Sequence, residues 1–123
     1  MSVANVQPAA ALDCANAMST PDLNACSEIE YKTADADLNA AYRKALAEIA
    51  KTDLEAPHDP KSFEAAFRKS QRAWVAWRDA ECEGLMPMFM GGGSATTGAI
   101  LGCLTEKTQA RAKEISERLT PPW

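Results

Sequence analysis

The chain contains 123 residues, of which 46% are hydrophobic, and its 17 Asp and Glu residues outnumber 13 Lys and Arg residues to give a formal net charge of −4. This length allows one small domain with a hydrophobic core, and the slightly acidic balance argues against a nucleic-acid binder, which carries a basic patch. No apolar run approaches the roughly 20 residues that span a membrane.

Residues 1–19 are expected to form an N-terminal arm, followed by one helical domain over residues 20–123. A signal peptide has a basic segment and a long apolar segment, and both are missing from the opening MSVANVQPAAALDCANA. The Ala-rich, uncharged composition is typical of a mature N-terminus behind an added start Met. We therefore predict an exported protein whose signal peptide has been removed.

The first predicted helix begins in STPDLNAC, where Ser19 or Thr20 can cap it and Pro21 suits its first turn. Apolar residues then recur at helical spacing from Leu23 to Ile49. This stripe predicts one long helix over about residues 20–51.

The second predicted helix begins at Asp59-Pro60, by the same combination of a capping residue and a proline. It is expected to run to about Glu83, where Gly84 can end it. One stripe of this helix contains the residues Phe63, Phe67, Ser70, Trp74 and Trp77. We predict that both tryptophans lie in the core.

The segment QRAWVAWRDAEC, residues 71–82, places charged residues next to these tryptophans. Arg78 is four residues from Trp74, so its guanidinium is expected to lie over an indole or to pair with a carboxylate of the first helix. Asp79 is expected to pair with Arg72 or Lys107. We interpret this segment as a structural network, with a partner-binding patch as the alternative.

The third predicted helix is capped by Ser94 or Thr96 and is ended by Pro121-Pro122. Its stripe contains Ile100, Leu101, Leu104, Thr108, Arg111, Ile115 and Leu119. No strand-like alternation is long enough to predict a sheet. The fold is therefore predicted to be all-α: a three-helix bundle, or a helical hairpin with a long first helix, packed by the aromatic residues of the second helix.

Four cysteines, Cys14, Cys26, Cys82 and Cys103, lack the close pairs of a zinc site. Two disulfides are the better interpretation and place the protein in an oxidising compartment. Three pairings are possible. We favour Cys14–Cys26, which ties the arm to the first helix, and Cys82–Cys103, which ties the second helix to the third.

Residues that could support catalysis are sparse. The single histidine, His58, lies in a Pro-flanked linker, and the carboxylate pairs in the helices are two residues apart and so point in different directions. The segment GGGSATTG does not follow a strand and lacks the Lys of a phosphate-binding loop. We therefore predict no catalytic residues, no cofactor and no enzymatic activity.

The segment LMPMFMGGGS, residues 85–94, is unusually apolar and is followed by glycines. We expect it to cross the ends of the helical hairpin as a loop or lid. A partner-contact surface is one alternative. A Cu(I) site is another, because Met86, Met88 and Met90 present thioethers at every second position.

Four blocks combine in one pattern: LDCANAMSTPDLNAC, DADLNAAYRKAL, RKSQRAWVAWRDAEC and GGGSATTGAILGCLTEKTQARAKEISERL. This combination, from Leu12 to Leu119, resembles the LprI-like lysozyme-inhibitor N-terminal family of small exported bacterial domains. The matching positions are Cys14, Cys26, Asp35 or Asp37, Leu38, Tyr42, Gln71, Arg72, Trp74, Arg78, Asp79, Cys82, Gly92, Gly93, Cys103 and Arg111. The resemblance implies a helical, disulfide-tied fold outside the cytoplasm and inhibition of lysozyme. The chain departs from the pattern in its longer, Met-rich segment at residues 85–94.

The leading hypothesis is a periplasmic or secreted binding module that sterically blocks a basic, lysozyme-like enzyme of cell-wall degradation. Its candidate contacts are Met86, Met88, Phe89 and Met90, with Glu81 and Glu83 as an acidic rim. The alternatives are a periplasmic Cu(I)-binding protein that uses the three methionines, and an envelope scaffold without a ligand.

Overall fold

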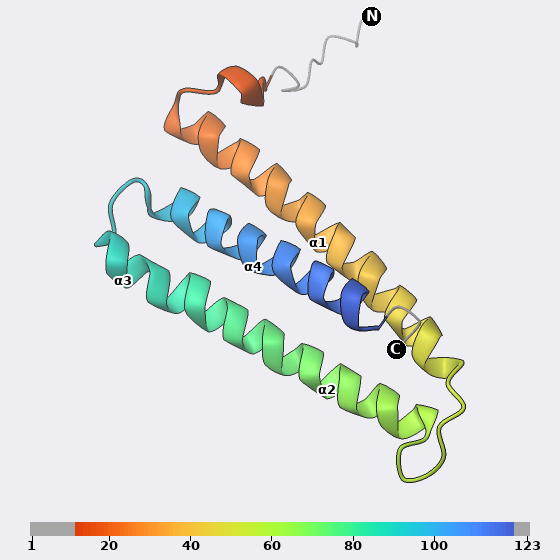
Figure 1. The fold of residues 1–123 in the computed structure, drawn as a ribbon. Helices are drawn as coiled ribbons and strands as arrows, with labels where there is room; N and C mark the ends of the chain where they lie inside the picture. The colour runs from red at the N-terminus through yellow and green to blue at the C-terminus, as the bar shows by residue number, and fades with distance from the viewer. Residues whose placement is uncertain (1–11, 120–123) are drawn as a thin grey trace, which may run out of the picture.

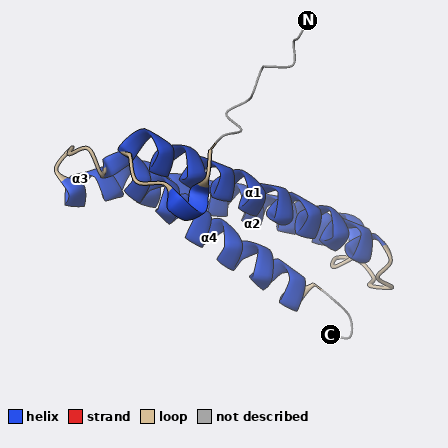
Figure 2. Ribbon diagram, turned by 90° about the horizontal axis from the view of Figure 1, so that it is seen from above, coloured by secondary structure: helices blue, strands red, loops and turns tan. Residues whose placement is uncertain are grey.

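The computed structural model describes residues 12–119. Residues 1–11 of the expected N-terminal arm lie outside this range, as do residues 120–123 with the prolines expected to end the third helix. Three long helices make up most of the described part: α1 (Thr20–Ala50), α2 (Pro60–Asp79) and α4 (Thr96–Arg118). The described residues contain no strand (Figure 2), and the prediction of an all-α, three-helix fold is confirmed.

Helix α1 follows a short 3-10 turn, η3 (Cys14–Asn16), and begins with a side-chain cap. Ser19, not Thr20, is the capping residue: its hydroxyl accepts the backbone N–H of Asp22 at 3.2 Å. The buried stripe of α1 contains Cys26, Ala34, Leu38, Ala45 and Ile49. Lys51 ends the helix as predicted.

Helix α2 begins as predicted, because the Asp59 carboxylate accepts the backbone N–H of Ser62 at 3.0 Å. Hydrogen bonds from Ser62 lower the pKa of that carboxyl below its usual value. The prediction that Gly84 ends this helix is wrong. The chain continues through a six-residue π-helix, η4 (Ala80–Leu85), into the short helix α3 (Met86–Met90).

The two tryptophans of α2 differ in environment. Trp74 is half-buried against the core, as predicted. Trp77 is 48% exposed, so its prediction as a core residue is wrong. Helix α4 packs sparsely against α2, and Lys107 Nζ lies 5.2 Å from the Trp77 ring centroid at the surface.

Helix α4 starts without a side-chain cap. Its N-cap residue is Ala95, so the prediction that Ser94 or Thr96 caps this helix is wrong. The predicted stripe is correct, since Leu104, Thr108, Arg111 and Ile115 are all buried.

The three long helices lie side by side with α4 in the middle (Figure 1). Helices α1 and α4 run in one direction and α2 runs in the opposite one. Helix α4 packs most extensively against α1 and much less against α2. This unequal packing leaves space between α2 and α4.

Two clusters of buried residues hold the bundle together. The larger cluster consists of Leu38, Ala45, Ile49, Phe67 and Ile115. The Tyr42 and Phe67 rings stack beside it, with centroids 5.1 Å apart. The smaller cluster surrounds Cys82, Cys103 and Leu104.

Both favoured cysteine pairs form disulfides. Cys14–Cys26 joins η3 to α1 with a Cα–Cα distance of 5.6 Å, and Cys82–Cys103 joins η4 to α4 at 5.5 Å. We call residues 12–38 and 75–107 the disulfide end and residues 39–74 and 108–119 the opposite end.

Candidate functional site

Helix α3 occupies the place of the predicted loop, and glycines end it. Gly91 adopts a left-handed conformation with a φ of 66°, and its N–H donates to the Pro87 carbonyl at 3.0 Å. Gly92 follows with a φ of 75°. These conformations favour glycine and reverse the chain toward α4. The expectation that residues 85–94 form a loop is therefore wrong for Met86–Met90, which are helical.

The helical backbone gathers apolar side chains on the surface of α3. Met88 and Phe89 are 77% and 73% exposed, and Leu85 and Met90 are also exposed. Leu85 lies three and four residues before Met88 and Phe89, so the three are neighbours on a helix. We call Leu85, Met88 and Phe89 the α3 patch; Met90, two residues after Met88, is exposed on another side of α3. Three neighbouring exposed apolar side chains at one helix end are typical of a contact surface.

Met86 does not belong to this patch. It packs against the buried cluster of Cys82, Cys103 and Leu104, so it anchors α3 to the bundle. Leu85 has the opposite role: it was not among the expected contacts, yet it is exposed, four residues before Phe89 on the same side of the helix. Helical spacing over residues 85–90 predicts that Leu85 lies next to Met88 and Phe89.

The helical geometry of α3 removes the premise of the copper alternative. On a helix, residues two apart point about 200° away from each other, so Met88 faces away from Met86 and Met90. Met86 is packed in the core while Met88 is exposed. The three thioethers therefore do not converge on one point. Within residues 12–119 no cluster of three His, Cys, Asp or Glu side chains could hold a metal ion either.

Glu81 and Glu83, the residues expected to form an acidic rim, precede α3 in the chain. Glu83 is exposed and Glu81 is half-buried in the π-helix directly before α3. They belong to a larger charge asymmetry: the disulfide end has ten Asp and Glu residues against three Lys and Arg, and the opposite end has seven against ten. The α3 patch thus lies on the acidic end of the molecule.

The motif of α2 forms a polar network beneath this surface. Arg78 is buried; its Nε donates to Asp79 at 2.9 Å and its Nη1 to Thr108 at 3.3 Å. Its guanidinium lies 5.2 Å from the Trp74 ring centroid, as predicted, and 5.8 Å from that of Tyr31. Burial raises the pKa of Tyr31, although the Arg78 cation acts in the opposite direction. The predicted pairing of Asp79 with Arg72 or Lys107 is wrong, since Asp79 pairs with Arg78.

Arg111 completes the network from α4. Its Nε donates to Gln71 at 2.9 Å, its Nη1 to Glu114 at 2.6 Å and its Nη2 to Ser70 at 3.2 Å. Its guanidinium lies 5.9 Å from the Trp74 centroid, so the two buried arginines both contact this indole. Gln71, Trp74, Arg78 and Asp79 therefore hold α2 against α4 and, through Tyr31, against α1.

Arg72 is the exception among the motif residues of α2. It is exposed and borders a cavity of about 400 Å³ with Tyr42 and Arg68. The Arg68 guanidinium lies 5.9 Å from the Tyr42 ring and bonds Glu64 at 2.8 Å, so this side of α2 is a solvated surface.

These features define a small helical domain, tied by two disulfides, that presents an apolar patch on an acidic end. The family model for the lysozyme inhibitor LprI matches residues 13–115, and the chain belongs to this family. The disulfides and the family together indicate an exported protein. No helix within residues 12–119 has the length and apolar character to cross a membrane.

Two relatives extend this comparison. An uncharacterized protein of Rhizobium meliloti is 39% identical over 108 residues, which cover 85% of this chain and 77% of the relative. The uncharacterized protein YecT of Escherichia coli is 38% identical over 64 residues, which cover 50% of this chain and 38% of YecT. No solved structure matches the chain.

Proposed function

We propose that this protein is a periplasmic or secreted inhibitor that sterically blocks lysozyme or another basic enzyme of cell-wall degradation. The observation that carries the proposal is the α3 patch: Met88 and Phe89 are about three-quarters exposed on a helix that is fixed to the bundle. A soluble domain that presents such side chains on a braced helix has a preformed contact surface. The family name supplies the class of target.

The position of the α3 patch supports a basic target. The ten acidic and three basic residues of the disulfide end give this half a formal charge of −7, whereas the whole chain has −4. An enzyme of opposite charge is attracted to this end first, and charge complementarity raises the association rate more than the final affinity. The patch then provides the apolar contact that keeps the complex together.

The first experiment measures whether the oxidised protein slows cell-wall lysis by a C-type lysozyme at low and raised salt. We expect inhibition that weakens as salt is raised. The variant Phe89→Ser should lower the affinity by about 10-fold or more, because a large exposed ring is a typical binding anchor. Its matched control is Leu54→Ser, which removes an exposed apolar side chain at the opposite end.

Charge reversal tests the contribution of Glu81 and Glu83 separately from that of the α3 patch. The double variant Glu81→Lys/Glu83→Lys should slow association by about 10-fold at low salt, with a smaller effect on dissociation. The control Glu55→Lys/Glu117→Lys makes the same charge change at two exposed residues of the opposite end. Equal effects of the two double variants, or unchanged inhibition by Phe89→Ser, would exclude the disulfide end as the contact surface.

A further inference from the structure

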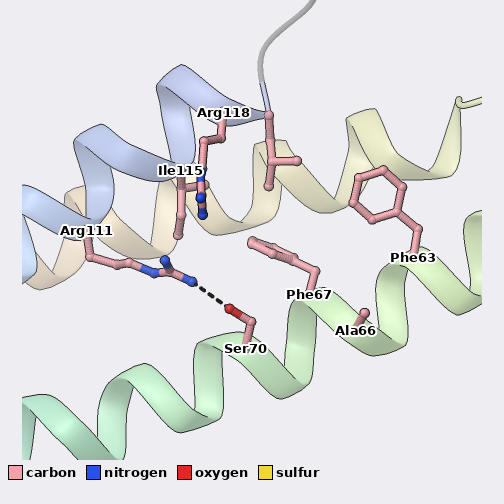
Figure 3. Close-up of a pocket in the computed structure, with 8 residues that line it drawn as sticks. Phe63, Ala66, Phe67, Ser70, Arg111, Ile115 and Arg118 are labelled. Atoms are coloured by element: carbon pink, nitrogen blue, oxygen red, sulfur yellow. Dashed lines mark hydrogen bonds between the residues drawn. The ribbon is translucent and has the colours of Figure 1, made fainter. Parts of the chain in front are cut away.

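A groove between α2 and α4 opens at the opposite end of the bundle, far from the α3 patch. Helix α4 packs closely against α1 but only sparsely against α2, and a cavity of about 430 Å³ remains between their facing sides. Figure 3 shows that Phe67 and Ile115 meet across this space, with Phe63 at one side. Apolar cavities of this size are typical of small-molecule sites.

The groove has a cationic mouth. Arg111 and Arg118 of α4 line it, and no acidic residue is among its described lining residues. Arg111 is held by three hydrogen bonds and is 8% exposed, so its position is fixed. The Arg118 side chain is 70% exposed and, among the described residues, forms one ion pair, a 3.9 Å contact with Glu114, so it can turn toward a ligand. Figure 3 shows the Arg118 side chain extending toward the space above Phe67 and the Arg111 guanidinium beside it, pointing to Ser70.

A second cavity extends the apolar surface along α2. It measures about 270 Å³, shares Phe63 and Ala66 with the first, and is bordered by Leu54 and His58 of the preceding linker. A ligand that begins at the arginines therefore finds apolar side chains over the length of both cavities. Their volumes, about 430 and 270 Å³, suit a single acyl chain better than a double-chain lipid.

We infer that this groove binds a free single-chain amphiphile with a carboxylate head, of the fatty-acid type. The carboxylate pairs with Arg118 beside the fixed cation of Arg111, since a guanidinium matches a carboxylate in charge and geometry. The acyl chain lies over Phe63 and Phe67 and continues toward Leu54. The net positive charge of the opposite end, ten basic against seven acidic residues, favours an anion there.

The position of Glu114 provides a further test of the inferred carboxylate site. Its carboxylate bonds Arg111 at 2.6 Å and lies 3.9 Å from Arg118, so it competes with the ligand head for the same cations. Replacing it with the neutral amide should therefore strengthen binding. A purely hydrophobic groove would not respond in this way.

The experiment titrates the full, oxidised chain with sodium dodecanoate below its critical micelle concentration, by calorimetry. We expect saturable one-to-one binding that dodecyltrimethylammonium and dodecyl maltoside do not reproduce. Arg118→Glu should weaken it by about 10-fold or more, as expected for loss of a charged hydrogen bond, and Glu114→Gln should tighten it. Lys113→Glu, an equal charge reversal on the exposed side of α4, should leave it within about 2-fold.

A second pair of variants tests whether the acyl chain binds in the apolar part of the groove. Ala66→Trp fills the groove and should abolish binding, whereas Ala65→Trp, on the exposed side of α2, should preserve it; both are checked for helix content. Equal binding of the cationic amphiphile, no effect of Arg118→Glu, or loss of binding in Phe89→Ser would overturn the inference. That last result would assign the amphiphile to the α3 patch instead.

Discussion

The two ends of the bundle are stabilised by different means. The opposite end is held by ordinary packing, since Ala45, Ile49, Phe67 and Ile115 form one buried cluster there. The disulfide end has few buried large side chains and holds its helices with the Cys82–Cys103 bond and the Met86 side chain. Its large apolar residues face outward in the α3 patch. A small domain that exposes such residues needs a covalent substitute for the core it gives up.

The largest loss of stability is expected from the double variant Cys82→Ala/Cys103→Ala, which removes the covalent bond between η4 and α4 at the disulfide end. Closing a loop of 21 residues contributes about 3 kcal/mol in the chain-entropy model, and this bond lies within the buried cluster of Cys82, Cys103 and Leu104. We expect a loss of this size in the free energy of urea unfolding. We also expect loss of inhibition, because α3 is no longer held against α4.

The matched control is Cys14→Ala/Cys26→Ala, which opens a loop of 12 residues in which Cys14 is exposed. Its effect should be smaller and should leave α3 in place. If the two double variants lose equal stability and equal inhibition, the special role of the Cys82–Cys103 bond is wrong.

The next largest loss of stability is expected when the polar network that joins the two ends is broken. Arg111→Met removes donors to Ser70, Gln71 and Glu114 at a buried position. We expect a loss of about 2 kcal/mol in unfolding free energy, because charged hydrogen bonds contribute in this range. Lys113→Met, an exposed site two residues away, should change the stability little; a comparable loss there would contradict a specific role for Arg111.

A smaller effect tests how the helices begin. Ser19→Ala removes the cap of α1 and should lower the unfolding free energy by about 1 kcal/mol. Ser94→Ala should have no measurable effect, because Ser94 does not cap α4. Thermal unfolding of the two variants side by side distinguishes them. A destabilised Ser94→Ala would mean that α4 has a cap that the structure does not show.

The smallest expected effect is a change in the pH dependence of stability, caused by Tyr31 at alkaline pH. Burial raises the folded-state pKa of Tyr31 above its ordinary value of about 10. The contribution of the neutral phenol to stability is then fully present below that ordinary value and is lost as pH rises through the raised pKa. Tyr31→Phe should therefore lose less stability than the parent chain between neutral and alkaline pH, as measured by urea unfolding. Parallel pH curves would exclude this contribution.

Local signals in the sequence were sufficient for most of the fold. A capping residue followed by a proline located the starts of α1 and α2, because both signals act within one turn. The disulfide pairing followed from the order of the helices. Arg78 over the Trp74 indole was predictable from a spacing of four residues.

The errors have a common cause in tertiary structure. Gly84 and Gly91 have the same local propensity to end a helix, yet only Gly91 does so, because the disulfide and the packing of Met86 keep the segment between them helical. The exposure of Trp77 depends on how closely α2 approaches α4. Ser70 and Gln71, two of the partners of Arg111, lie about 40 residues away in the chain, so no local pattern reveals them.

The length of α1 has a practical consequence. Its 31 residues form one uninterrupted helix of about 45 Å that separates the α3 patch from the linker over residues 51–59. A fluorophore, an affinity tag or a solid support attached within this linker is therefore remote from anything bound at α3. Immobilised through the linker, the protein should capture its target as efficiently as it does in free solution.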